Sequence, residues 1–509
     1  METSIQEIQN VFDKIKLLAL KEFDNKNYEL SLQYIEAAAH VAYSFNWKYA
    51  DEVLENLLVA ISDVIIAERS VFIPIQGRIV FYDVFALDNR GLTQQYLRAL
   101  ISWGVELLFI FEGDDLSHSK QIMSEIKSYS KAELFVVDHS LTKTEKINCI
   151  YNKIIDFKPE KAFLHLNPSS VVAIGVWNSL KEVARYLVNL TDHAFWLGTK
   201  CIDYSLEFRN YGCTVSYEKR NLSEDQLLIQ PYYPIMQCKP FIGFPSQIAD
   251  DAIKIFTGGS YYKMYGKSDF FLNLLKLLIE LDSKIVILLA GHGHDGPIKQ
   301  FISDNKYERR LFLLGSRPDI THVFEHCDIY LSTYPLTGGL MGQYAASLAK
   351  PILSYTSDDI PSNFAEGFIN WNTNSDFKIT HTTLDSFTAE ALKMIESKFY
   401  REKKGNENKK HIITEKEFSE HLRKLVSLNR MENPFVKEVI DYKVFLDLYI
   451  ENENKYLKQF NYLIVSQFKF QSLLLFPKQS ISFIFSAKSW TIIGKFFNKR
   501  KVDFNMKNA

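Results

Sequence analysis

In its second half the chain reads Asp328-Ile329-Tyr330-Leu331-Ser332-Thr333-Tyr334-Pro335-Leu336-Thr337-Gly338-Gly339. The apolar start predicts a buried strand, and the glycine pair predicts a tight turn. Residues 340–349 predict a helix, so Thr337, Gly338 and Gly339 would lie where a strand meets a helix N-terminus. Free amide groups and the helix dipole favour an anion at such a place. The segment therefore predicts one unit of an α/β fold with a diphosphate-binding turn.

Similar units lie on both sides of this segment, because short apolar runs alternate with helical segments in two series. The predicted strands are Arg78–Val84, Val105–Phe111, Glu133–Val137, Ala162–Leu166 and Ala194–Leu197, then Ala252–Thr257, Ile285–Ala290, Arg310–Leu314, Ile329–Ser332 and Pro351–Ser354. Four of the chain's 14 prolines fall in residues 231–245, which predicts a linker. We therefore expect two Rossmann-like domains, residues 75–235 and 245–400, that face one another across a cleft.

Both ends of the chain are expected to be helical. Residues 1–70 carry apolar residues at helical spacing with a break at Asp24–Asn27, and they resemble one tetratricopeptide-like hairpin. Residues 401–509 predict further helices that end in a basic tail. Residues 466–509 hold eight Lys or Arg and one acid, a net charge of +7, among many aromatic residues. This tail would suit an anionic membrane surface, or it could pack on the protein with a basic edge exposed.

Other predicted strand ends add to the expected anion site. After the strand that ends near Thr257 and Gly258, small residues allow close backbone approach and Lys263 adds a point charge. Gly315, Arg317 and Pro318 follow the third strand of the series and could border a nucleoside base.

Residues 291–296 match the dinucleotide fingerprint G-x-G-x-x-G. They follow the second strand of their series rather than the first, and no acid ends the next strand. Gly291 is therefore expected to make a tight turn beside a nucleotide pocket, and an NAD-dependent oxidoreductase is disfavoured.

In the first series, Asn89, Arg90 and Gly91 lie between a strand and a helix. Their backbone N–H groups could hold an oxygen-rich acceptor, or the segment could be a plain turn.

The order of these segments over residues 75–400 resembles the GT-B glycosyltransferases. It is similar to family 41, the group of the O-linked N-acetylglucosamine transferases and the bacterial cytoplasmic protein N-glucosyltransferases. The resemblance places Lys263 at the donor diphosphate and matches Thr337, Gly338 and Gly339 to the phosphate-binding turn. It matches residues 191–198, with the later Asp203 and Phe208-Arg209, to a segment common in bacterial enzymes of this kind. The donor it implies is a nucleotide sugar, UDP-linked, with no resident cofactor.

The same resemblance frames the expected chemistry. The sequence has no Asp-x-Asp, the paired carboxylates with which GT-A enzymes hold a divalent ion, so no metal is expected. Lys263 and backbone dipoles would then stabilise the departing diphosphate. No acid lies between Asp328 and Asp358, which favours inversion at the anomeric carbon. Inversion needs a base, for which His193, Asp192 and His165 are the candidates, although each could instead be structural.

Five scattered cysteines without a Cys-x-x-Cys pair, and an N-terminus unlike a signal peptide, predict a cytoplasmic protein, with the tail at the inner face of the membrane. A net charge of −2 gives no reason to expect nucleic acid as a partner. A glycan or lipid-linked acceptor in surface polysaccharide synthesis is the first hypothesis. A protein acceptor is the alternative, favoured by the N-terminal helices. A non-catalytic sugar-nucleotide-binding partner of another transferase is a third, and a homo- or hetero-oligomer stays open.

Overall fold

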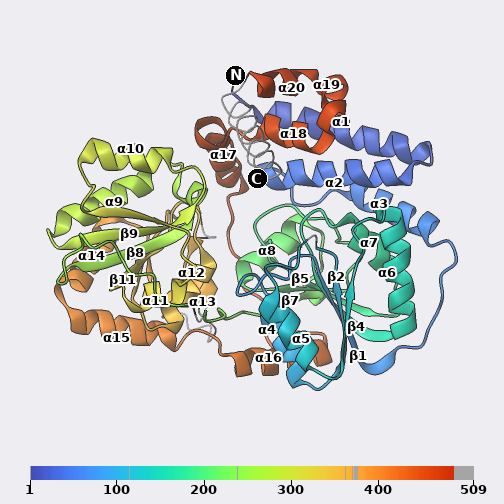
Figure 1. The fold of residues 1–509 in the computed structure, drawn as a ribbon, viewed down its shortest axis with the longest axis horizontal. Helices are drawn as coiled ribbons and strands as arrows, with labels where there is room; N and C mark the ends of the chain where they lie inside the picture. The colour runs from blue at the N-terminus through green and yellow to red at the C-terminus, as the bar shows by residue number, and fades with distance from the viewer. Residues whose placement is uncertain are drawn as a thin grey trace, which may run out of the picture.

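The computed structural model describes residues 2–113, 115–237, 239–360, 363–369, 371 and 376–485. Within these residues there are two β-sheets, seven strands in the order β3-β2-β1-β4-β5-β6-β7 and six in the order β10-β9-β8-β11-β12-β13. The paired strands are parallel in both sheets. The two sheets lie side by side, each flanked by helices (Figure 1). The predicted fold class, α/β with two Rossmann-like units, is confirmed.

The first sheet is covered on both faces, so its inner strands are near-continuous apolar runs. Val80 and Leu108 pack into one core, while their neighbours Phe81 and Phe109 pack into another on the opposite face. The strands are β1 (Ile75–Asp83), β2 (Glu106–Phe111), β3 (Ala132–Val136), β4 (Pro159–His165), β5 (Ala184–Val188), β6 (Tyr204–Glu207) and β7 (Leu227–Ile229). The helices are α4 (Thr93–Ser102), α5 (Lys120–Ser128), α6 (Lys143–Phe157), α7 (Val171–Trp177) and α8 (Asn210–Lys219).

The predicted strand at Ala194–Leu197 is wrong. These residues are buried, but they form a loop between β5 and β6. The carbonyl of Ala194 accepts a hydrogen bond from the Arg220 guanidinium at 2.6 Å, and the amide of Leu197 donates to Pro168 O at 3.0 Å. A buried side chain and another loop therefore satisfy backbone groups that a strand would give to its neighbour. His193, expected at a strand start, lies in this loop.

The second sheet confirms all five strands predicted for its series and adds a short sixth. Its strands are β8 (Ile253–Ser260), β9 (Ile285–His292), β10 (Leu311–Gly315), β11 (Ile329–Leu331), β12 (Ile352–Tyr355) and β13 (Thr380–His381). Its helices are α9 (Phe270–Leu281), α10 (Gly296–Asn305), α11 (Ile320–Glu325), α12 (Gly339–Ser347), α13 (Glu366–Ile369), α14 (Leu384–Glu396) and α15 (Lys398–Lys409). The connections run outward in opposite directions from β8 and β11, so these two strands flank the topological switch point, where α/β sheets bind ligands.

The N-terminal helices are α1 (Ile5–Asp24), α2 (Tyr28–Phe45) and α3 (Glu52–Ile65). Each begins at a side chain that accepts a hydrogen bond from the first turn: Ser4, Asn27 and Asp51. The predicted break at Asp24–Asn27 separates α1 from α2, and α3 joins this hairpin as a further helix.

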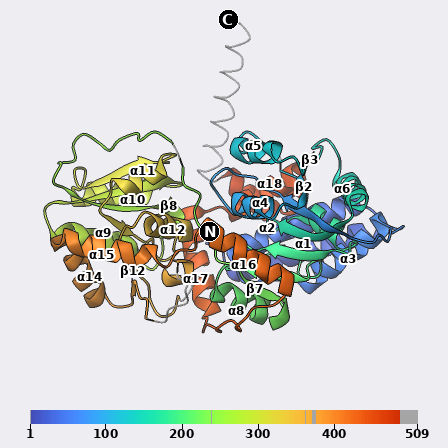
Figure 2. The same cartoon turned by 90° about the horizontal axis from the view of Figure 1, so that it is seen from below.

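The C-terminal helices pack on parts of the chain that lie far away in sequence. They are α16 (Glu415–Leu428), α17 (Tyr442–Asn452), α18 (Phe460–Phe468), α19 (Ser472–Leu475) and α20 (Pro477–Ile484). Helix α16 returns to the first domain, where Phe418 meets Tyr96 of α4 with ring centroids 5.2 Å apart. Helices α18 to α20 lie beside α1 and α2 (Figure 1), and Figure 2 shows α18 next to α2 from below. Phe460 of α18 contacts Phe45 of α2, with ring centroids 5.4 Å apart.

Helix α17 lies at the junction of the N-terminal helices and the two domains. Its Phe445 shares a core with Tyr49, Tyr211 of the first domain and Met264 of the second. In the described part of the chain, no helix has both the length and the apolar character needed to cross a bilayer.

Candidate functional site

The turns that follow β8 and β11 are joined at the switch point of the second sheet. Lys263 lies in a short 3₁₀ turn (Tyr261–Met264) directly after β8. Its ammonium donates to Thr337 O at 3.5 Å, and the amide of Leu336 donates to Lys263 O at 3.2 Å. The structure thus brings together Lys263 and the Thr337-Gly338-Gly339 turn, which lie 74 residues apart in the chain.

The electrostatic setting of Lys263 favours an anion. Burial lowers the pKa of its ammonium, Asp192 of the first domain raises it, and Arg209 lowers it again. A buried ammonium whose charge is only partly balanced by a carboxylate is stabilised by a further negative group nearby. A diphosphate would supply that charge.

The glycine turn caps the N-terminus of α12. Gly338 is the cap residue, and a side chain on Gly339 would collide with the Phe368 ring. Met341 and Gly342 donate their amides to Gly338 O, whereas among the described residues the amides of Gly339 and Leu340 have no backbone acceptor. Such free amides at a helix start bind oxyanions.

Thr337 has a different role from its two neighbours. Its amide donates to Asn363 Oδ1 at 2.8 Å, and its hydroxyl donates to Asn363 O at 3.2 Å. Thr337 therefore anchors the turn to Asn363, and within the described residues the amides of Gly339 and Leu340 are the ones left to bind a ligand.

Small residues are needed at the ends of β8 and β9. A side chain on Gly258 would meet Ala290 O at 2.9 Å and Met341 Cε at 3.3 Å, and one on Gly291 would overlap Gly259 O. Gly291 lies inside β9 opposite Gly259, where the missing side chain lets the two strands pack closely. The tight turn expected at Gly291 is therefore wrong for this residue, since β9 continues to His292. Thr257 is fully buried, and its hydroxyl has no partner within the described residues.

The residues after β10 include a buried ion pair, Arg317 with Asp319. The Arg317 guanidinium makes two bonds to Asp319, at 2.7 and 2.6 Å, and a third to Gly243 O in the linker at 2.9 Å. The bonds from Arg317 to Asp319, together with one from the amide of Ile242 at 2.8 Å, lower the pKa of Asp319 to about 2. Gly315 has a positive φ of 64°, and Pro318 separates the paired residues. This arrangement fastens the linker to the second domain.

On the first domain, the buried carboxylate of Asp192 has two side-chain partners. Asp192 Oδ2 accepts from Arg209 Nε at 2.6 Å, and its Oδ1 lies 3.1 Å from His193 Nδ1. Burial alone would raise the pKa of Asp192, but Arg209 and His193 hold it well below its usual range. The guanidinium of Arg209 also lies 4.0 Å from the ring centre of Phe368 in the second domain. This group therefore sits at the contact between the two domains, close to Lys263.

His193 remains accessible, with 39% of its side chain exposed. Because an ionised Asp192 accepts from Nδ1–H, the Nε2 atom of His193 is left as a proton acceptor. This geometry suits a base.

His165 is built into the interior instead. It ends β4 and pairs with Asp83 at the end of β1, Nδ1 to Oδ1 at 3.1 Å, and both side chains are 0% exposed. Thr93 donates to the other oxygen of Asp83 at 2.5 Å. Nε2 of His165 has no partner among the described residues, and Gly91 is so close that a Cβ atom on it would lie 3.4 Å from Cε1 of the ring.

The loop above His165 is fixed by hydrogen bonds. The amide of Asn89, at φ 60°, donates to Gln94 Oε1 at 2.6 Å, and Asp88 accepts the first amides of α5. Burial raises the pKa of Tyr344 in α12, and the positive charge of the exposed Arg90 opposes this rise. Arg90 therefore lies near the second domain, at the junction between the domains, and an acceptor-binding role for Asn89, Arg90 and Gly91 stays a prediction.

Glu438, which lies between α16 and α17, is a further group of this site that the sequence does not predict. Its amide donates to Thr214 Oγ1 at 3.0 Å, which holds the segment against α8. Burial raises the pKa of its carboxyl to about 7; Arg209 opposes this shift and Asp192 adds to it. No motif signals this residue, because only the return of the chain after α16 brings it to the Asp192–Arg209 pair.

The raised pKa of Glu438 predicts a pH-dependent effect on stability. The folded carboxyl keeps its proton up to about pH 7, whereas the unfolded one loses it near pH 4.3. The folded state binds more protons in between, so this group lowers the free energy of unfolding as pH rises through that window. Glu438→Gln does not titrate, and we expect it to gain roughly 1–3 kcal/mol over the wild type between pH 5 and pH 8. Denaturant unfolding at both pH values measures the difference, and a pH-independent difference would contradict the assignment.

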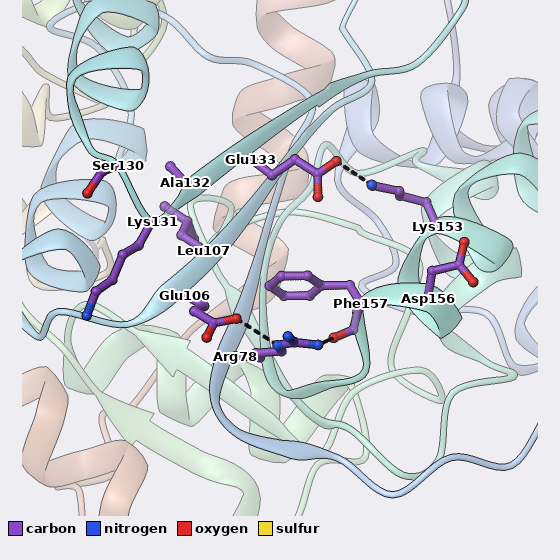
Figure 3. Close-up of a pocket in the computed structure, with 10 residues that line it drawn as sticks. All are labelled: Arg78, Glu106, Leu107, Ser130, Lys131, Ala132, Glu133, Lys153, Asp156 and Phe157. Atoms are coloured by element: carbon purple, nitrogen blue, oxygen red, sulfur yellow. Dashed lines mark hydrogen bonds and ion pairs between the residues drawn. The ribbon is translucent and has the colours of Figure 1, made fainter.

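One surface hollow lies away from these groups. It has a volume of about 580 Å³ and lies at the amino ends of β1 to β3 (Figure 3). Its charges are paired, Arg78 with Glu106 at 2.8 Å and Lys153 with Glu133. Parallel sheets bind ligands at the carboxyl ends of their strands, so this hollow is not the candidate site. Within the described residues, no group of three or more His, Cys, Asp or Glu is placed to hold a metal ion.

Comparison with known proteins supports the fold. No family model and no curated protein matches the sequence. A Thermobaculum terrenum O-GlcNAc transferase structure is similar over 83% of this chain and 81% of its own, with 12% identity and a TM-score of 0.51. A Rickettsia africae glycosyltransferase is similar over 69% and 97%, with 11% identity and a TM-score of 0.50. The chain has the GT-B fold. In GT-B terms, β8 and β11 belong to the C-terminal domain, and Lys263 and α12 face the N-terminal domain.

Proposed function

We propose that this GT-B protein is an inverting, metal-independent glycosyltransferase that moves a hexose-type sugar from a nucleoside diphosphate, UDP, to a glycan or lipid-linked acceptor. The observation that carries the proposal is that Lys263 contacts the turn at the start of α12, whose amides are free, at the switch point of the second sheet. The two solved structures of similar fold are named as an O-GlcNAc transferase and a glycosyltransferase, which supports sugar transfer. In the cell, we place the protein in the cytoplasm at the inner face of the membrane, in surface polysaccharide synthesis.

The proposed reaction is a single displacement. The acceptor oxygen attacks the anomeric carbon while the bond from that carbon to the diphosphate oxygen breaks. The acceptor proton passes to a base of the first domain, His193, Asp192 or His165. The negative charge that grows on the diphosphate is met by Lys263 and by the amides of Gly339 and Leu340.

A protein acceptor is the alternative, and one observation favours it. Burial raises the pKa of Tyr262, the neighbour of Lys263, to about 12, and Tyr43 of α2 lies close enough to raise it further. The N-terminal helices thus reach the donor side, where they could guide a polypeptide. A non-catalytic sugar-nucleotide-binding partner of another transferase would have the donor groups without a working base.

A donor screen tests this function. With several UDP- and GDP-sugars and no acceptor, we expect slow hydrolysis of one nucleotide sugar, unchanged by excess EDTA, because Lys263 and backbone amides take the place of a metal. Reversible loss of turnover in EDTA would contradict metal independence. Tight nucleotide binding without any hydrolysis or transfer would favour the binding-partner alternative.

A further inference from the structure

The last helices of the described chain bury polar side chains and expose apolar ones. In α19 and α20 the residues buried against the protein are polar: Ser472, Gln479 and Ser480. Gln479 Nε2 donates to Glu7 Oε1 of α1 at 3.0 Å, and Ser480 Oγ has no partner within the described residues. A helix on a water-facing surface normally buries its apolar stripe.

The side chains that face outward there are apolar. We call Phe470, Leu473, Leu474, Ile481 and Phe485 the outer apolar surface; the exposed fractions of Phe470, Leu474 and Phe485 are 90%, 87% and 82%. Leaving such a side chain in water forgoes about 1.5–3 kcal/mol that burial would provide. Apolar residues gathered on short helices that pack together therefore indicate a contact surface.

The helices that carry this surface are firmly attached. Phe468 is buried and stacks on Tyr34 of α2 with centroids 5.6 Å apart. Phe476 is buried as well, with the ammonium of Lys14 5.0 Å from its ring centre. The outward side chains are thus presented by a fixed scaffold that joins the N-terminal helices to the last described helices.

Charge identifies the occupant. Lys469 lies within the same helices, as does Lys478, which pairs with Glu7 at 3.1 Å. The sequence that follows, 486–509, holds six Lys or Arg and one acid, a net charge of +5. A second copy seated on the same face would bring two such segments together, and like charges repel. An anionic bilayer accepts both the apolar side chains and the basic charge. We propose that the outer apolar surface docks this protein on an anionic lipid bilayer, independently of sugar transfer.

Sedimentation with vesicles tests the proposal on the full chain. The wild type is expected to bind vesicles of phosphatidylcholine with phosphatidylserine, and to bind less to phosphatidylcholine alone or at high salt. Phe470→Ser combined with Leu474→Ser and Phe485→Ser should weaken binding by roughly tenfold or more, because apolar insertion is lost. The matched control is Val71→Ser with Ile73→Ser, two exposed apolar residues between α3 and β1. This control should bind like the wild type.

A charge variant separates the two contributions. Lys499→Gln with Arg500→Gln and Lys501→Gln should weaken binding to anionic vesicles only. Donor hydrolysis should persist in all these variants, so failure of this proposal is distinct from failure of the proposed function. The proposal is overturned if the wild type does not bind vesicles, or if the triple serine variant binds as well as the control. If another copy or the chain's own last residues cover the surface, the serine variant changes oligomeric state or unfolding temperature instead, which also overturns it.

Discussion

Replacing Lys263 with alanine is expected to lower the turnover rate by about 10²–10³-fold, a loss of roughly 3–4 kcal/mol in the transition state. Its ammonium is held at the Thr337 carbonyl, beside the amides of Gly339 and Leu340. Charge on the diphosphate oxygen grows as the glycosidic bond breaks, so this contact should strengthen towards the transition state. Turnover should therefore fall more than donor affinity.

Lys267 provides a matched control. It lies four residues further along the same loop and its ammonium pairs with Asp359 at 2.8 Å, away from the glycine turn. Lys267→Ala should cost within about 0.5 kcal/mol of stability and leave turnover unchanged. Steady-state kinetics and nucleotide titration on both variants decide the matter. Near-normal turnover in a folded Lys263→Ala protein would place the phosphate site elsewhere.

The donor side could be predicted from the sequence because each of its parts follows a strand with a clear local pattern. Lys263 comes after an apolar run and two glycines, and Gly338 precedes a helix. In a parallel sheet, such strand ends share one edge, so local patterns become neighbours in space. All five strands of that series were predicted for the same reason.

The acceptor side could not be predicted as well, since its groups depend on long-range packing. The run Ala194–Leu197 is apolar enough to suggest a strand, and only the bond from Arg220 shows that it is a buried loop. β5, which carries Arg185, was overlooked; this charge is buried in β5 but paired with Asp203 at 2.6 Å. Glu438 reaches the site only through the return of the chain after α16, which no local pattern encodes.

The second large effect concerns the choice of base. His193→Ala is expected to reduce turnover by about 10²–10⁴-fold while donor binding changes little, because a base acts on the acceptor proton rather than on the diphosphate. Two geometric facts favour His193. Its ring is 39% exposed, and Asp192 holds its Nδ1 at 3.1 Å, which leaves Nε2 free to take a proton. Asp192 and Arg209 also shift the pKa of Lys263, so this pair on the first domain lies close to the donor-side lysine.

His165 is the competing base, and its variant separates the two. Its ring is fully buried next to Gly91 and is bonded to Asp83, so an acceptor could reach Nε2 only if the loop of Gly91 moved. His165→Gln should therefore lower stability by about 1–3 kcal/mol, through the lost buried hydrogen bond, yet keep most of the turnover of the folded fraction. His193→Ala should show the opposite pattern, a stable protein with little activity. If the folded His193 variant keeps its rate while the folded His165 variant loses it, the proton is taken beneath Gly91. If both keep it, Asp192 remains as the candidate, because it is the third group at this junction able to accept the proton.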